Sequence, residues 1–281
     1  MSREEEDDPM GIESMATEKT RITKRRLSSS KNSRTEMTRS FDDIDKLLNL
    51  DFTSFQGFSS RMDHLVSLDA TSWAIEILYS WNTYHPGIID QPRKQVLEDC
   101  WSYSFSRGQS SLVKRLESPR KILTQKAIFY GVDEKCISED GGLIDFELLV
   151  RFLKENDYVE DMILHEKEGD DPEQYFGNLI RRLLGISPIV ICIDCPPSFE
   201  SFTGTRGIYT PLEVEIEATR FESFTQHSFL LTGHGLVIYN GVESVRFLEF
   251  QDSQGKDWGE NGFLKIANIY PFIKNVIEFK V

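Results

Sequence analysis

The chain has 281 residues, of which 39% are hydrophobic and 11% aromatic, including 19 phenylalanines. This is enough apolar side chain to build a core, which excludes a chain that is disordered throughout. The formal net charge of −14 argues against a general nucleic-acid-binding protein, and no stretch approaches the roughly 18 apolar residues of a membrane helix.

The first 50 residues differ in composition from the rest. An acidic run, Glu4 to Asp8, is followed by eight basic residues and a single acid between Lys19 and Arg39. Because this segment has little apolar surface to bury, we expect a disordered tail over 1–50 and a globular domain over 51–281. The run Lys24 to Arg26 fits either a nuclear-targeting patch or a solvated basic tail.

After Phe41 the apolar pattern becomes that of a folded domain. Helical spacing, with Asp69 or Thr71 as the first cap, predicts helices over 70–81, 93–100, 119–129, 145–155 and 172–184. Extended apolar runs predict strands over 188–194, 228–232, 235–239, 245–251, 262–266 and 276–280. A helical first half followed by a β-rich second half indicates an α+β fold.

The four cysteines, Cys100, Cys136, Cys192 and Cys195, do not suggest a disulfide framework. The N-terminal residues lack the apolar core of a signal peptide, so we expect an intracellular protein, cytoplasmic or nuclear, and not a secreted one. Cys192 and Cys195 lie at the end of a predicted strand, where residues three apart point to opposite faces. We therefore expect no metal and no cofactor there.

Several segments resemble motifs of the papain-like cysteine peptidases. The run His227 to Gly233, HSFLLTG, is similar to the segment that begins with the family's catalytic histidine, and Trp258 to Gly262 reads WGENG as in the family. Ala70 to Ala74, ATSWA, resembles the nucleophile segment GSCWA, and Gln95 to Cys100 resembles a family helix that ends in a half-cystine. Ser72 precedes His227 by 155 residues, close to the roughly 130–150 typical of the family.

The resemblance implies a papain-like fold over 51–281, in which a helical lobe faces a β-barrel lobe with the site between them. It places Ser72 at the nucleophile, His227 at the base and Asp252 at the asparagine that orients the base. In the family a thiolate at a helix N-terminus pairs with the histidine, and a serine hydroxyl has too high a pKa to replace it. The family's oxyanion-binding glutamine becomes Val66, and its shielding tryptophan becomes Gln254.

These four departures predict an inactive pseudo-peptidase that keeps a cleft for a peptide or protein. An alternative is an active serine-type peptidase or esterase, because Ser72, His227 and Asp252 have the composition of a serine-hydrolase triad. The tail does not resemble the family's inhibitory propeptide, so we expect none. The resemblance also makes Cys100 a half-cystine whose partner position holds Asp69, so that disulfide is not expected.

Overall fold

The computed structural model describes residues 73–167, 172–202, 207–219, 221, 224–239 and 242–281. The predicted tail, the boundary at residue 50, and the residues Val66, Asp69 and Ser72 lie outside this part of the chain. The other residues of the resemblance lie within it, namely Cys100, His227, Asp252 and Gln254.

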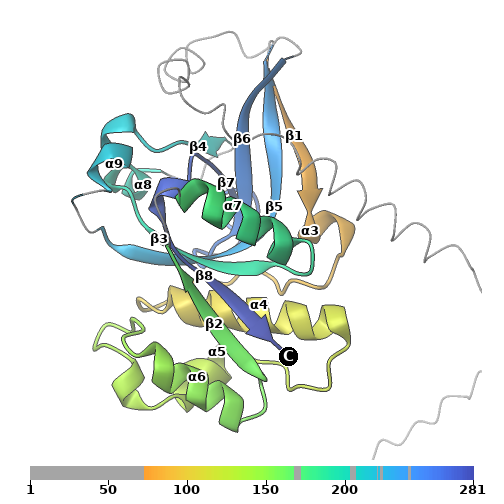
Figure 1. The fold of residues 1–281 in the computed structure, drawn as a ribbon, viewed down its shortest axis with the longest axis vertical. Coiled ribbons are helices and arrows are strands. Elements are labelled where there is room, and N and C mark those ends of the chain that lie inside the picture. Colours follow the sequence, from red (N-terminus) through yellow and green to blue (C-terminus); the bar gives the residue numbers. More distant parts are fainter. Residues whose placement is uncertain (1–72, 168–171, 203–206, 220, 222–223, 240–241) are drawn as a thin grey trace, which may run out of the picture. The chain divides into compact units, whose positions relative to one another are not determined.

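Helices and strands alternate irregularly along the described chain (Figure 1). The helices and 3-10 turns are α3 (Trp81–Tyr84), α4 (Cys100–Leu116), α5 (Gln125–Gly131), η2 (Glu134–Cys136), α6 (Phe146–Glu155), α7 (Pro172–Leu184), α8 (Pro197–Glu200), α9 (Glu213–Ala218) and η3 (Tyr270–Phe272). The strands are β1 (Trp73–Ser80), β2 (Asp161–Glu166), β3 (Ile189–Asp194), β4 (Ile208–Tyr209), β5 (Gln226–Tyr239), β6 (Val242–Gln251), β7 (Phe263–Ala267) and β8 (Ile273–Lys280).

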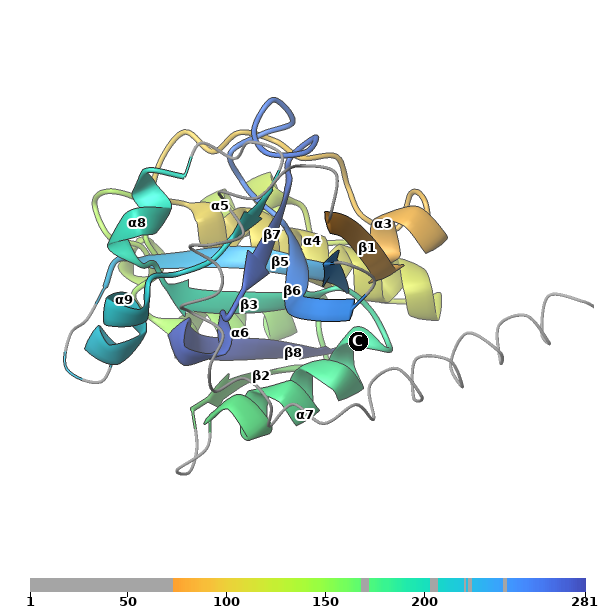
Figure 2. The same ribbon diagram turned by 90° about the horizontal axis from the view of Figure 1, so that it is seen from above.

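These strands form one mixed sheet in the order β2-β8-β3-β5-β6-β7-β4, and β1 pairs separately with β5. The pairings are antiparallel except for β4 with β7, which is parallel. β5 is the longest strand, with 14 residues, and contacts three partners. Its first half pairs with β3 and its second half with β1. Both ribbon views place α8 and α9 at one end of the sheet and β1 with α3 at the other (Figure 1, Figure 2).

The 17-residue helix α4 packs against the sheet along a stripe of positions at i, i+4, i+7 and i+11. Trp101, Phe105 and Leu112 of this stripe are buried, and Gly108 is its closest point to the sheet. A Cβ at Gly108 would lie 2.7 Å from Val190 Cγ2. The absence of a side chain there lets the helix backbone approach β3.

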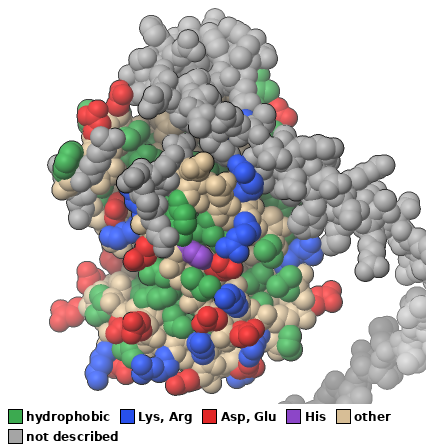
Figure 3. Space-filling model, viewed as in Figure 1, with side chains coloured by type: hydrophobic (Ala, Val, Ile, Leu, Met, Phe, Trp, Pro, Cys, Tyr) green, Lys and Arg blue, Asp and Glu red, His purple; other side chains and the backbone are tan. Residues whose placement is uncertain are grey.

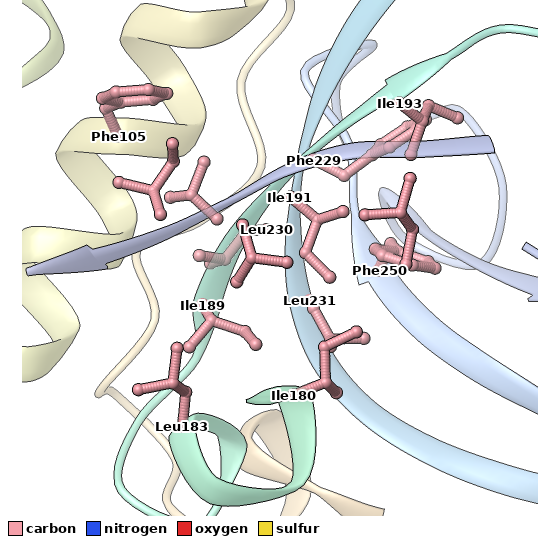
Figure 4. Close-up of a cluster of buried hydrophobic side chains, with 14 of the residues drawn as sticks. Phe105, Ile180, Leu183, Ile189, Ile191, Ile193, Phe229, Leu230, Leu231 and Phe250 are labelled. Carbon is pink, nitrogen blue, oxygen red and sulfur yellow. The ribbon is translucent and has the colours of Figure 1, made fainter. Parts of the chain in front are cut away.

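The opposite face of β3 and β5 carries the larger part of the core. Successive strand residues point to opposite faces, so Ile189, Ile191 and Leu231 face away from α4. Figure 4 shows Leu231 and Ile189 directed toward Ile180 and Leu183 of α7, with Phe105 of α4 across the strands. The strands therefore lie between α4 and α7, and apolar side chains are buried on both faces.

The helix expected over 70–81 is wrong, because residues 73–80 form β1. Its half-buried Ile75 and Ile77 alternate with exposed Ala74 and Glu76, which is the period of a strand. The apolar residues at 73, 74, 77, 78 and 81 also fit a helical spacing. Pairing with β5 selects the strand.

Two other helix predictions are corrected at their starts. Residues 93–99 are not helical, and the helix begins at Cys100, where the prediction ended. The helix expected from Pro119 begins instead at Gln125, with the Thr124 hydroxyl accepting from Ala127 N as the cap.

The remaining element predictions are largely confirmed. Helix α7 has the predicted bounds, α6 begins one residue after its cap Asp145, and β3, β6, β7 and β8 lie where strands were expected. The strands expected over 228–232 and 235–239 are one strand, because Gly233 and Gly235 do not form a turn. The α+β prediction is confirmed.

In the lower part of the view in Figure 3, acidic, basic and apolar side chains are interspersed on the surface. Among the described helices, none combines the length and apolar character needed to cross a bilayer.

Candidate active site

Cys100 occupies the first residue of α4, a position that the sequence motifs matched only to a half-cystine. Asp99 precedes the helix as its N-cap residue, and Cys100 itself is buried. The first backbone N–H groups of a helix have no partner within the helix, and the helix dipole is positive at this end. Both features favour a negative charge on a side chain placed there, such as a cysteine thiolate.

His227 and Asp252 are brought together by the pairing of β5 with β6. His227 is the second residue of β5, and Asp252 follows the last residue of β6. Because Leu230 pairs with Gln251, the start of β5 lies beside the end of β6. His227 Nε2 lies 2.9 Å from Asp252 Oδ1, and the side chains are 13% and 1% exposed.

The histidine is surrounded by groups that favour its charged form. Burial on its own lowers the pKa of His227, but the charge and hydrogen bond of Asp252, together with a hydrogen bond to Cys100, outweigh it and raise the pKa to about 10. Cys100 is thus a second partner of the His227 side chain, besides Asp252. The edge of the Phe229 ring meets the imidazole, with centroids 4.4 Å apart.

A pair of serines fixes the first turn of α4 against β5. Ser104 lies one turn after Cys100, and Ser228 follows His227. Their hydroxyl oxygens are 2.6 Å apart in the buried interface. This contact holds the helix start at the beginning of β5, and so holds Cys100 beside His227.

Asp252 is held by its backbone as well as by its carboxylate. Its N–H donates to Gly262 O at 3.0 Å, and its carbonyl accepts from Arg107 Nη1 at 3.0 Å. Its Oδ1 accepts from Ser253 N at 2.5 Å in addition to the histidine. The carboxylate therefore has a fixed orientation toward His227.

Gln95 lies next to this pair, five residues before Cys100. Its N–H donates to Ser253 O at 2.7 Å, and its Oε1 accepts from the Ser253 hydroxyl. Its Nε2 donates one N–H to Leu97 O at 3.0 Å. The side-chain amide is thus fixed close to the start of α4.

The described structure places Trp73, the residue after the predicted nucleophile, far along β5 from the predicted base. Ser72 is outside the described residues, but it is bonded to Trp73, which pairs with Tyr239 at the far end of β5 from His227. Tyr239 and His227 are twelve positions apart on β5, a path of about 40 Å along an extended strand. The helix that was expected to begin at Ser72 is absent, and the helix that begins beside His227 is α4.

One signal in the sequence could have identified Cys100. Both Ser72 and Cys100 precede a tryptophan, but only Cys100-Trp101 keeps the Cys-Trp pair of the papain signature. His227 follows Cys100 by 127 residues, which is nearer the family range than the 155 from Ser72. Cys100 thus fits the nucleophile segment of the resemblance as well as the half-cystine position.

The other cysteines are not arranged as a site. All four cysteines are free thiols, and burial raises the pKa of Cys192 to about 12. Within the described ranges, no group of three or more His, Cys, Asp and Glu residues is placed to hold a metal ion. Gln254, at the family's tryptophan position, is exposed, and its backbone forms an isolated antiparallel bridge with Lys94. Asp252 is buried although no tryptophan stands at position 254 to shield it.

Comparison with known proteins points to one fold. No family model matches the chain. A cysteine proteinase of Theileria annulata is 24% identical over 180 residues, which cover 59% of this chain and 38% of that relative. The match thus spans well under half of the relative's length.

Solved structures share the arrangement of elements at low identity. Bromelain from Ananas comosus, in complex with the E64 inhibitor, superimposes with a TM-score of 0.51 at 12% identity over 72% of this chain and 98% of bromelain. A recombinant stem bromelain precursor gives 0.54 at 12% identity over 91% of this chain and 94% of the precursor. A procathepsin B from Trypanosoma congolense gives 0.53 at 11% identity over 74% and 78%. At such identities these likenesses show the fold, which is papain-like.

Proposed function

We propose that this chain, which has a papain-like fold, is a cysteine peptidase whose nucleophile is Cys100. The observation that carries the proposal is the placement of Cys100 at the start of α4, beside a histidine that is hydrogen-bonded to Asp252. A nucleophile, a base in contact with it and a third group that orients the base are the parts of a covalent hydrolase site. The pseudo-peptidase hypothesis relied in part on Ser72 as the nucleophile, and a cysteine beside His227 supports the active alternative.

In the proposed reaction the Cys100 thiolate attacks the carbonyl carbon of a peptide bond while His227 is an imidazolium. The carbonyl π electrons move to oxygen, and His227 gives its proton to the leaving amine as the C–N bond breaks. The resulting thioester is cleaved by water, whose proton His227 accepts, and the thiolate is released. The backbone N–H of Cys100 and the second amide N–H of Gln95 are the proposed donors to the oxyanion.

Asp252 gives this site a carboxylate where the resemblance expects an asparagine. A carboxylate stabilises the imidazolium more than an amide does, in line with the raised pKa of His227. The site is therefore a Cys–His–Asp arrangement, in which Asp252 favours the charged form of His227. This argues against treating Asp252 as a sign of lost activity.

The serine-type alternative has no support, because the segment joined to Ser72 pairs with the far end of β5. An inactive homologue that binds a peptide or protein remains the competing proposal, since the family's tryptophan is Gln254. An intracellular location is also proposed, on the basis of four free thiols, and is tested by imaging a tagged full-length chain.

The test is covalent labelling of the full chain with E64, the inhibitor bound in the bromelain structure, followed by intact mass and peptide mapping. One adduct on Cys100, abolished in Cys100→Ala and strongly slowed in His227→Ala, is expected. Cys195→Ala is the matched control and should label like the wild type. No adduct on a folded protein, with iodoacetamide reacting at Cys100 only at the rate of a free thiol, would establish the inactive homologue instead.

A further inference from the structure

Arg107 is an arginine in the interior, two turns after Cys100 on the same helix. It is 4% exposed, and its Nη1 donates to the backbone carbonyl of Asp252 at 3.0 Å. Its Nη2 is buried and has no hydrogen-bond partner. The proposed reaction does not use this guanidinium, and a buried arginine is rare unless a charged partner compensates it.

The charges around the site explain why an arginine is buried there. A thiolate on Cys100 and an imidazolium on His227 cancel, so Asp252 adds one negative charge that an asparagine would not bring. A buried charge without compensation is strongly destabilising. Arg107 restores neutrality to the group of four side chains.

Neighbouring groups leave Arg107 to interact mainly with Asp252. Asp90 also faces it, but Lys114 Nζ lies 2.8 Å from Asp90 Oδ1 and compensates that carboxylate. Tyr103 presents its ring at 5.5 Å. Burial lowers the pKa of Arg107 to about 10, opposed by Asp252 and Asp90 and assisted by Arg93, so the guanidinium stays charged at neutral pH.

We propose that Arg107 is a positioning residue that holds Asp252 by its carbonyl and places a buried positive charge beside it, so that Asp252 orients His227. Arg107 acts through Asp252 and does not touch the reacting atoms. The proposal rests on the proposed role of Cys100. It predicts that the effects of substituting Arg107 and Asp252 are coupled, because a residue that acts through another loses its importance when that partner is changed.

The experiment compares four proteins: the wild type, Arg107→Met, Asp252→Asn and the double variant. Iodoacetamide alkylation of Cys100 is followed from pH 4 to 10 by peptide mass spectrometry, which separates Cys100 from the other three thiols. Urea unfolding of the same proteins gives a second readout that does not depend on Cys100 chemistry.

We expect Arg107→Met to move the acid limb of the Cys100 profile to higher pH by about one unit, or about tenfold in rate at pH 5. Without the arginine, Asp252 loses the hydrogen bond to its carbonyl and is held less firmly toward His227, so it supports the imidazolium less. In the Asp252→Asn background there is no carboxylate for the arginine to hold, so the same substitution should change the rate at pH 5 by about twofold or less. The unfolding midpoint should follow the same pattern.

Equal shifts in both backgrounds, or no shift in folded Arg107→Met, would overturn the proposal. If Arg107→Met does not fold, Arg107→Lys is used in its place. This variant keeps the positive charge, so the acid limb of its Cys100 alkylation profile should stay at the wild-type pH. If wild-type Cys100 titrates like an ordinary thiol, the proposed function fails. The unfolding data then decide separately whether Arg107 and Asp252 are coupled.

Discussion

Gly233 makes a close backbone contact between β1 and β5, and replacing it by alanine should separate these strands. A Cβ at Gly233 would lie 2.3 Å from the Tyr79 carbonyl oxygen and 2.9 Å from the Ser80 Cα. Both are backbone atoms, so no side chain can rotate out of the way. The end of β1 must move instead.

The cost of this movement is estimated from the contacts that it breaks. Overpacking in a tight interior costs about 1–3 kcal/mol. The Ser80 hydroxyl donates to buried Glu249 Oε1 at 2.7 Å, and the Thr232 hydroxyl donates to the same oxygen at 2.9 Å, so losing the Ser80 donor costs about 1 kcal/mol. Replacing glycine in a strand returns about 0.5–1 kcal/mol. We expect a net loss of about 1–3.5 kcal/mol, or a fall in Tm of about 2–14 °C.

Urea unfolding of Gly233→Ala, followed by tryptophan fluorescence and circular dichroism, measures this loss. The matched control is Gly177→Ala in α7, where an added Cβ has no atom within 4 Å. The control should be unchanged or more stable by about 0.5–1 kcal/mol. If Gly233→Ala unfolds at the same urea concentration as the control, the close approach of β1 to β5 is not as described.

Three further predictions concern buried side chains. Burial raises the pKa of Glu249, so the folded state binds a proton that the unfolded state releases. The free energy of unfolding should therefore fall as pH rises above about 4.5. Glu249→Gln should remove this dependence, measured as urea midpoints at pH 5 and 8. Burial of the thiol raises the pKa of Cys192 to about 12. Iodoacetamide at pH 8 should therefore alkylate Cys192 at least about 100-fold more slowly in the folded protein than in 8 M urea. Equal rates would contradict the burial of this thiol. Phe176→Ala should lose about 3–5 kcal/mol of unfolding free energy, whereas Phe221→Ala, which is 87% exposed, should lose less than about 0.5 kcal/mol.

The elements that the sequence predicted well are those whose apolar pattern matches their burial. In β3, Ile189, Ile191 and Ile193 are all buried in one continuous run, and α7 presents Phe176 and Ile180 at helical spacing. Such patterns survive into the fold because burial decides them locally. They gave the bounds of α7 and the positions of the C-terminal strands.

Helix α4 was missed because its polarity resembles that of a loop. It contains five serines, and all five are buried. Four of their hydroxyls donate to the carbonyl three residues earlier, so they need no water: Ser102 to Asp99, Ser104 to Trp101, Ser106 to Tyr103 and Ser110 to Arg107. Hydropathy alone does not distinguish such serines from those of an exposed loop.

Two residues of the candidate site, His227 and Asp252, could be predicted from the sequence. His227 and Asp252 stand in motifs that the strands keep in register, and the structure places them 2.9 Å apart. The nucleophile is predicted at Ser72 because ATSWA resembles the family segment GSCWA and a helical spacing fits residues 73–81. Only the pairing of Trp73 with Tyr239, a contact between distant parts of the chain, excludes that helix.

The separation of Cys100 from its base along the chain affects when the thiol becomes reactive. Cys100 leaves the ribosome 127 residues before His227. At about 5–20 residues per second, this interval lasts about 6–25 seconds, during which the base has not been made. Contacts between distant parts of a chain also form slowly once both parts exist. Under the proposed function, a newly made chain therefore lacks the base that would activate Cys100 until its last strands are in place.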